Sequence, residues 1–278
     1  MKYILNFLKK QPLICAILAF VFCMGSLMSL YTGTPTGDLL LRLLFSGTCG
    51  VFLYLISGEK AVRDYSGSTA YVIKTLSVYW IILGLLGCLS VLPAFFIDDT
   101  EFYSDWYFRL ITNIFFYLSV GLFEELLFRA IINDALIYQF RNVKHIFLIS
   151  GILTSFVFGF AHVFQVFLVG DVDSGIEAAQ AVMKIISTAV FGLNPLVMYW
   201  KTRNIWACAV VHGGFDFFSS ISTSIIVSEN PESYVNASGG MGLVIAYAIQ
   251  TLIEFIVFIV VWNKIGKKID FEKLREEW

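Results

Sequence analysis

The chain has 278 residues, of which 58% are hydrophobic, 17% are aromatic and only 14% are charged. A soluble domain carries roughly a quarter charged residues, so this composition excludes an ordinary soluble enzyme and indicates a polytopic membrane protein. The formal net charge of -2 gives no indication of a nucleic-acid partner.

Several apolar stretches are long enough to cross a membrane, for which a helix needs about 20 residues. In chain order they are 12–31, 39–57, 71–96, 110–132, 147–168, 176–199, 205–227 and 239–262. Loops with polar and turn-forming residues separate these spans. The sequence therefore predicts an all-α bundle of about eight transmembrane helices, in which residues 1–278 form a single integral membrane domain.

Lysine and arginine occur in every second loop, which predicts the orientation of the bundle. They precede the first span, follow the second, fourth and sixth, and recur in the C-terminal tail: Lys2, Lys9, Lys10, Lys60, Arg63, Lys74, Arg141, Lys144, Lys201, Arg203, Lys264, Lys267, Lys268, Lys273 and Arg275. The intervening loops 32–38, 97–108, 169–175 and 228–238 contain none. Because positive loops stay in the cytoplasm, we expect both termini there.

Ionisable residues lie inside three of the spans at a similar depth. Glu124 and Glu125 are near the middle of span 110–132, His162 follows the middle of 147–168, and His212 and Asp216 flank the middle of 205–227. Each charge at this depth costs about 2.5–3.5 kcal/mol on insertion scales. Random drift would not be expected to bring such groups to one depth on three helices, so they predict a small polar chamber inside the bundle.

Helical spacing separates the roles of the two glutamates. Neighbouring residues of an α-helix point about 100° apart, so Glu124 and Glu125 cannot share one direction. Glu125 and Arg129 are four residues apart and lie on one face, where they can form a charge-neutralising pair. That pairing leaves Glu124 aimed elsewhere. Outside the chamber, we expect Lys184 and Glu254 to be poorly matched in depth for pairing and to face the bundle or snorkel.

Such a chamber is suited to more than one chemistry. A buried carboxylate beside imidazoles can take a proton from water and later deliver it, and the imidazoles can donate hydrogen bonds to a developing oxyanion. Hydrolysis of a peptide bond inside the membrane fits these parts. The same residues could form the proton relay of a transporter, or the chain could be a non-proteolytic immunity or regulatory scaffold.

Three motifs then point to one known family. The sequences EELLFR at 124–129, FGFAH at 158–162 and HGGFD at 212–216 resemble the signatures E-E-x-x-x-R, F-x-x-x-H and H-x-x-x-N/D of the CAAX-protease and bacteriocin-processing family of intramembrane proteases, also called CPBP or Abi. Their order, spacing and placement on three spans agree. The resemblance covers roughly 110–225 and implies a family-like catalytic core at 110–227.

The resemblance implies an endopeptidase with its site inside the bundle. The matching catalytic positions are Glu124, His162, His212 and Asp216. In this comparison Glu124 looks like the water-activating base with His162 as its partner. His212 and Asp216 look like the oxyanion-stabilising pair, and Glu125 with Arg129 looks like a supporting ion pair.

The resemblance leaves the use of a metal open. Glu124, His162 and His212 would be the ligands of a zinc ion, but the chain has no H-E-x-x-H motif and we favour metal-independent hydrolysis. Asp216 stands where eukaryotic members have asparagine. An acid there could hold His212 charged or bind a metal better, which keeps zinc in consideration.

The expected partners follow from the same comparison. They are a membrane-associated peptide or protein as substrate and the lipid bilayer itself. Eukaryotic relatives trim prenylated C-termini, whereas bacterial relatives are associated with peptide maturation and bacteriocin immunity. We expect a multi-pass protein of the plasma membrane, from a bacterium.

Overall fold

The computed structural model describes residues 3, 6–7, 10–30, 32, 34–57, 69–97, 100–169, 172–227 and 234–277. Over these residues the chain is helical without any strand, and a lone antiparallel bridge joins Phe102 to Ile226. This confirms the predicted all-α fold. Four of the basic residues that predict the orientation lie outside the described residues: Lys2, Lys9, Lys60 and Arg63.

The long helices match the predicted spans closely. They are α2 (Pro12–Ser29), α3 (Pro35–Ser57), α5 (Thr69–Val91), α6 (Trp106–Glu125), α8 (Ile146–Val169), α9 (Gly175–Thr202), α10 (Ile205–Ser219) and α11 (Gly240–Lys264). A π-helical segment, η2 (Leu126–Asn133), continues α6 into α7 (Asp134–Gln139). The remaining short elements are the 3-10 turns Leu92–Phe96, Ile221–Ser224 and Gly266–Lys268, and the C-terminal helix α12 (Phe271–Glu277).

The predicted span 205–227 is too long. Helix α10 ends at Ser219, and a 3-10 turn follows at Ile221–Ser224. This stretch is rich in serine and threonine, whose hydroxyls compete for backbone groups. The hydroxyl of Ser219 donates to the carbonyl of Asp216, and that of Thr223 donates to the carbonyl of Ser220.

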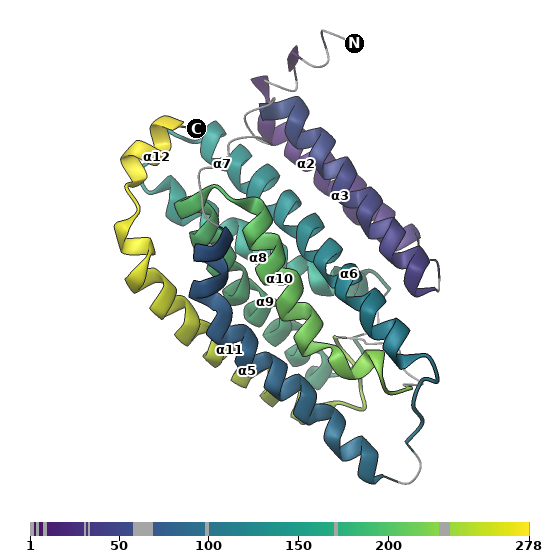
Figure 1. The fold of residues 1–278 in the computed structure, drawn as a ribbon. Coiled ribbons are helices and arrows are strands. Elements are labelled where there is room, and N and C mark those ends of the chain that lie inside the picture. Colours follow the sequence, from purple (N-terminus) through teal and green to yellow (C-terminus); the bar gives the residue numbers. More distant parts are fainter. Residues whose placement is uncertain are drawn as a thin grey trace.

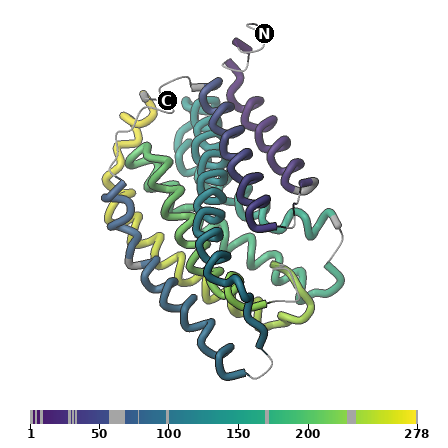
Figure 2. Tube along the Cα trace, turned by 45° about the vertical axis from the view of Figure 1, so that its right-hand side comes forward, coloured from purple at the N-terminus to yellow at the C-terminus, as the bar shows by residue number. Residues whose placement is uncertain are grey.

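The helices form one antiparallel bundle in which consecutive long helices run in opposite directions (Figure 1). Helix α6 packs against α3 and α10, while α9 packs against α8 and α11. The start of α2 and the C-terminal helix α12 lie at the same end of the bundle, as both views show (Figures 1 and 2). We call this the terminal end. The α2–α3 pair stands at one side and α5 with α11 at the other.

Five helical segments are long and apolar enough to cross a membrane by length and composition: Pro35–Ile56, Tyr79–Phe96, Ile146–Leu168, Gly175–Thr202 and Gly240–Lys268. Two shorter apolar helices are Pro12–Leu27 and Ile205–Ser219. Helix α6, which carries Arg109, Glu124 and Glu125, is in neither group. The total of eight spans and the cytoplasmic side of the termini therefore stay predictions.

Close helix contacts position the central helices. A Cβ atom on Gly121 of α6 would lie 2.5 Å from the backbone nitrogen of Gly213 and 2.6 Å from the carbonyl oxygen of Ala209, both on α10. A Cβ on Gly213 would in turn lie 2.5 Å from the carbonyl oxygen of Tyr117. Small residues of this kind let helix backbones approach each other within membranes. The contact fixes the level at which α6 and α10 meet, one turn from Glu124.

Candidate active site

The π-helical segment η2 begins directly after Glu125. Its hydrogen bonds run from residue i to i+5, so its turn is wider than that of an α-helix, and such segments are frequent at functional sites. Seven of its eight residues are buried, including Arg129 and Asn133. The segment therefore directs the charged side chain of Arg129 into the bundle. The hydrophobic periodicity of the sequence did not predict this change from α-helix to π-helix.

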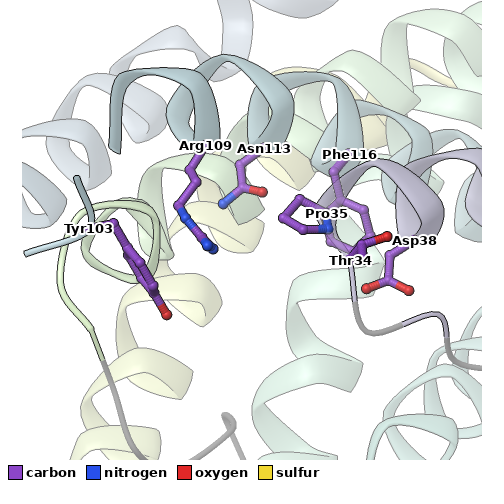
Figure 3. Close-up of a pocket in the computed structure, with 7 residues that line it drawn as sticks. All are labelled: Thr34, Pro35, Asp38, Tyr103, Arg109, Asn113 and Phe116. Carbon is purple, nitrogen blue, oxygen red and sulfur yellow. The ribbon is translucent and has the colours of Figure 1, made fainter. Parts of the chain in front are cut away.

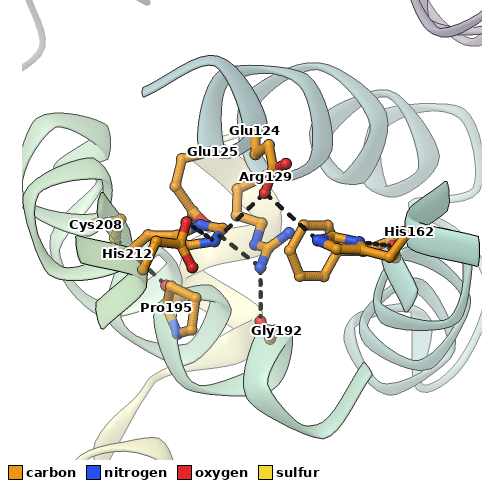
Figure 4. Close-up of polar contacts among 10 residues, drawn as sticks. Glu124, Glu125, Arg129, His162, Gly192, Pro195, Cys208 and His212 are labelled. Atoms are coloured by element: carbon orange, nitrogen blue, oxygen red, sulfur yellow. Dashed lines mark hydrogen bonds and ion pairs between the residues drawn. The ribbon is translucent and has the colours of Figure 1, made fainter. Parts of the chain in front are cut away.

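Glu124 lies between the two imidazoles (Figure 4). Its Oε2 atom is 3.3 Å from Nε2 of His212 and 4.0 Å from Nε2 of His162. The second distance is beyond a direct hydrogen bond, but a water about 2.8 Å from both atoms would complete a triangle. The carboxylate side chain is 15% exposed, so the site is internal without being sealed.

The ring of His162 is oriented by its own helix. Its Nδ1 atom lies 2.8 Å from the carbonyl oxygen of Phe158. A carbonyl can only accept, so Nδ1 carries a proton and donates it. In the neutral ring, Nε2 is then an acceptor on the side of Glu124. The Phe158 ring packs against the imidazole in an edge-to-face arrangement, with the ring centroids 4.7 Å apart.

His212 has carboxylates at both ring nitrogens. Its Nδ1 atom is 2.8 Å from Oε1 of Glu125, and its Nε2 atom is 3.3 Å from Glu124 and 3.5 Å from Oδ2 of Asp216. The histidine is 2% exposed, and the ring of Phe191 closes over it with the centroids 4.9 Å apart. A doubly protonated ring can donate in both directions.

Arg129 supports the same carboxylate. Its Nη2 atom lies 3.3 Å from Oε1 of Glu125 and donates to the carbonyl oxygen of Gly192 at 3.2 Å. The guanidinium also lies over the Phe158 ring, 4.4 Å from its centroid. Both members of the ion pair are buried. The spacing of the sequence predicted this pairing, but it did not indicate that Glu125 also contacts His212.

The structure thus brings all six predicted site residues together. They come from α6, η2, α8 and α10, and they are Glu124, Glu125, Arg129, His162, His212 and Asp216. This meets the geometric condition for a shared polar chamber. Their roles in catalysis stay predictions.

Three further charged residues interact electrostatically with residues of this chamber, and the sequence interpretation had placed two of them, Lys184 and Glu254, outside it. Arg42 of α3 interacts electrostatically with Glu124, and Lys184 of α9 interacts with His162 and Asp216. Glu254 of α11 is buried and accepts a hydrogen bond from Gln250 at 2.8 Å. The signal that could have found them was already present, because all three are ionisable residues inside apolar spans.

A polar pocket of about 410 Å³ lies near the starts of α3 and α6, at the end of the bundle opposite the terminal end (Figure 1), and is drawn in close-up in Figure 3. It is lined by Thr34, Pro35, Asp38, Tyr103, Arg109, Asn113 and Phe116. Arg42, one turn after Asp38, has its guanidinium 6.0 Å from the centroid of the Phe116 ring and interacts electrostatically with both Asp38 and Glu124. Arg42 therefore relates the pocket to the chamber through electrostatic interactions with Asp38 and Glu124.

The zinc ligands considered from the sequence were Glu124, His162 and His212. Within the described part of the chain, no group of three or more His, Cys, Asp or Glu residues has the arrangement to hold a metal ion. No step of the proposed reaction is assigned to a metal.

Comparison with known proteins identifies the segment that builds this site. Residues 106–218 match a family model described as Rce1-like, type II CAAX prenyl endopeptidase. No curated protein and no solved structure matches the chain. The matched segment runs from the start of α6 almost to the end of α10 and includes all six predicted site residues, from Glu124 to Asp216. Its helices and this match together make the chain an integral membrane protein. The resemblance indicated by the three motifs is thereby confirmed for residues 106–218, which match the Rce1-like family model.

Proposed function

We propose that this protein is an intramembrane endopeptidase that hydrolyses a membrane-associated peptide or protein with a water molecule activated by Glu124. The observation that carries the proposal is the position of the Glu124 carboxylate, 3.3 and 4.0 Å from Nε2 of two imidazoles on two other helices. A general base must lie within hydrogen-bond reach of the water that it deprotonates. A water held by Glu124 and His162 meets that condition.

In the first step, the carboxylate of Glu124 takes a proton from this water while the water oxygen forms a bond to the carbonyl carbon of the substrate. The carbonyl oxygen becomes an oxyanion. The Nε2–H of a protonated His212 can donate to this oxyanion, and fixed donors of this kind are typically worth about 10²–10³ in kcat. Asp216, 3.5 Å from the same nitrogen, stabilises the positive charge of the ring.

In the second step, the bond between carbonyl carbon and amide nitrogen breaks. Glu124 returns its proton to the leaving nitrogen, which departs as an amine, and the carboxylate is regenerated. Water and a peptide are consumed, and an acid and an amine are formed. Glu125 and Arg129 take no part in proton transfer and hold His212 in place.

In this proposal the reacting water enters from the polar pocket at the end opposite the terminal end. Arg42 supports this route because it interacts electrostatically with Asp38 of the pocket and with Glu124. Our expectations of eight spans, cytoplasmic termini, a plasma-membrane location and a bacterial source form part of this proposal. The alternative function, a proton relay, would use the same side chains. The experiment below separates it from hydrolysis.

The test compares peptides released from cells that produce the intact protein with those from cells that produce Glu124→Gln, an isosteric change that removes the base. We expect a set of peptides that requires Glu124, and loss of their cleavage when the purified variant is placed in proteoliposomes. Unchanged peptide profiles in Glu124→Gln and His212→Ala would overturn the proposal. Proton-coupled uptake that both variants abolish would replace hydrolysis by transport.

A further inference from the structure

Tyr234 lies beside the chamber, in a segment that the family match does not cover. Its ring centroid is 5.9 Å from that of the His162 imidazole, and the two ring planes are tilted by 50°. The match ends at residue 218, whereas Tyr234 begins the segment 234–239, which leads into α11. The reaction proposed above gives this tyrosine no role. An aromatic ring therefore borders one of the two chamber histidines from outside the three motifs.

The side chain of Gln180 anchors this segment on α9. Its amide nitrogen donates to the carbonyl oxygens of Asn236 at 3.0 Å and of Gly240 at 2.9 Å. Its amide oxygen accepts from the backbone nitrogen of Asn236 at 2.9 Å. Gln180 is fully buried. Because a buried polar group that loses its partners is costly, these three hydrogen bonds hold segment 234–239 in one position.

Two further contacts fix Tyr234 itself. The hydroxyl of Tyr247 on α11 donates to the carbonyl oxygen of Tyr234 at 2.8 Å. The Nζ atom of Lys184 on α9 lies 4.0 Å from the centroid of the Tyr234 ring, which is the geometry of a cation–π contact. The backbone and the ring of this residue are therefore both held by side chains of rigid helices, as the wall of a binding site requires.

The exposed fraction of the residues increases from the centre of the chamber toward Tyr234. His212 is buried, the side chain of His162 is 16% exposed, and Tyr234 is 40% exposed. His162 also packs against the ring of Phe158, but that residue is fully buried. Of these two aromatic neighbours of His162, Tyr234 is therefore the one that an incoming molecule can touch.

We infer that Tyr234 is a specificity-determining residue, whose ring forms one wall of a subsite for a large apolar side chain of the substrate. Aromatic rings bind such side chains through large apolar contact areas. An extended peptide advances about 3.3–3.6 Å per residue, so the 5.9 Å between the Tyr234 and His162 rings places this side chain within about two residues of the cleaved bond. The inference rests on the proposed function, because it assigns a subsite of the same reaction.

The first test measures side-chain preference with the full chain in proteoliposomes. The probe is a lipid-anchored fluorogenic peptide library in which each position in turn is Phe, Leu or Ala. At one position we expect Tyr234→Ala to lower kcat/KM about tenfold for the Phe and Leu peptides, and less than about twofold for the Ala peptide. A merely structural role would lower all three equally. Tyr234→Trp, which has a larger ring, should shift the preference at that position toward Ala.

Tyr138→Ala is the matched control. Tyr138 on α7 has the same exposed fraction of 40%, and the guanidinium of Arg141 lies 5.0 Å from its ring centroid. The variant therefore makes the same change on a different helix, and it should leave the ratios of kcat/KM among the three peptides unchanged.

The second test does not depend on hydrolysis. Lipid-anchored peptides that carry p-benzoylphenylalanine at each position in turn are irradiated together with the Glu124→Gln protein, and mass spectrometry identifies the cross-linked residues. We expect the benzoylphenylalanine at one position to attach to segment 234–239. An excess of the Phe peptide should reduce this product more than an excess of the Ala peptide does, because the Phe side chain competes for the same wall.

The possible results separate this inference from the proposed function. Equal losses for the three peptides at every position, or cross-links that never reach segment 234–239, would overturn the subsite. Should Tyr234→Ala not fold, an unchanged preference in Tyr234→Trp would overturn it as well. Absence of any cleavage that depends on Glu124 would overturn the proposed hydrolase. In that case the cross-links still decide whether an apolar side chain of a peptide binds beside Tyr234.

Discussion

Oε1 of Glu125 lies 2.8 Å from Nδ1 of His212, closer than its 3.3 Å distance from Nη2 of Arg129. Oε1 of Glu125, which is buried, therefore contacts both the imidazole of His212 and the guanidinium of Arg129. An acid that orients a histidine through Nδ1 fixes which nitrogen faces the reaction, as in other histidine–carboxylate pairs. The second glutamate of the E-E motif acts on the central imidazole and not only on its arginine.

Glu125→Gln should lower kcat by about 10–100-fold with little change in KM, because an amide holds the His212 ring less firmly than a carboxylate does. The measurement is steady-state cleavage of the peptides identified with the Glu124 comparison. Full activity in a folded Glu125→Gln protein would contradict this role. Nitrogen NMR of the His212 ring provides a readout that a general loss of stability would not change.

Arg129→Met should destabilise the protein by about 3–5 kcal/mol, because it leaves the buried carboxylate of Glu125 without its cation. Thermal unfolding in detergent measures this effect. The double variant Arg129→Met/Glu125→Gln should recover part of the loss, since it removes both charges. Arg109→Met is the control. Its ion pair with Asp105 is partly exposed, so its removal should cost less than about 1 kcal/mol.

Gly121→Ala should weaken both stability and turnover. The added Cβ would meet the backbone of Gly213 and Ala209, neither of which can rotate away, so α6 and α10 must separate. Overpacking of this kind costs about 1–3 kcal/mol, and a displacement of about 1 Å at a reacting group can cost about 10² in rate. Gly47→Ala on α3 is the matched control because no atom lies within 4 Å of its added Cβ. Equal behaviour of the two variants would exclude the helix contact as the cause.

Asp134→Asn should loosen α7 without changing the chemistry of the site. Arg203 reaches both oxygens of Asp134, at 3.1 and 2.9 Å, and the hydroxyl of Tyr199 donates to the same carboxylate at 2.7 Å. Charge-assisted hydrogen bonds of this type contribute about 1.5–3 kcal/mol. Hydrogen exchange should show faster exchange in α7, with the kcat of the remaining folded protein unchanged. A fall in kcat at unchanged exchange would contradict the structural role.

Much of this protein is determined by local sequence. Long apolar stretches form helices because lipid offers no partner for backbone groups, and the helix satisfies them internally. The spacing of Glu125 and Arg129, and of His212 and Asp216, places each pair on one face because this depends only on helical geometry. The three motifs therefore sufficed to identify the six residues Glu124, Glu125, Arg129, His162, His212 and Asp216, which the structure brings together.

Tertiary packing decided the remaining relationships. The pairing of Glu125 with His212 depends on how α6 and α10 rotate and meet, which the backbone contact between Gly121 and Gly213 fixes. Lys184 of α9 lies over the ring of Tyr247 of α11 because these two helices pack together, a relation that depth along a single span does not reveal. Hydropathy predicts the depth of each residue along the membrane normal. The distance between charged groups on different helices depends on how each helix is rotated about its axis and on which helices pack together, and only the folded bundle determines both.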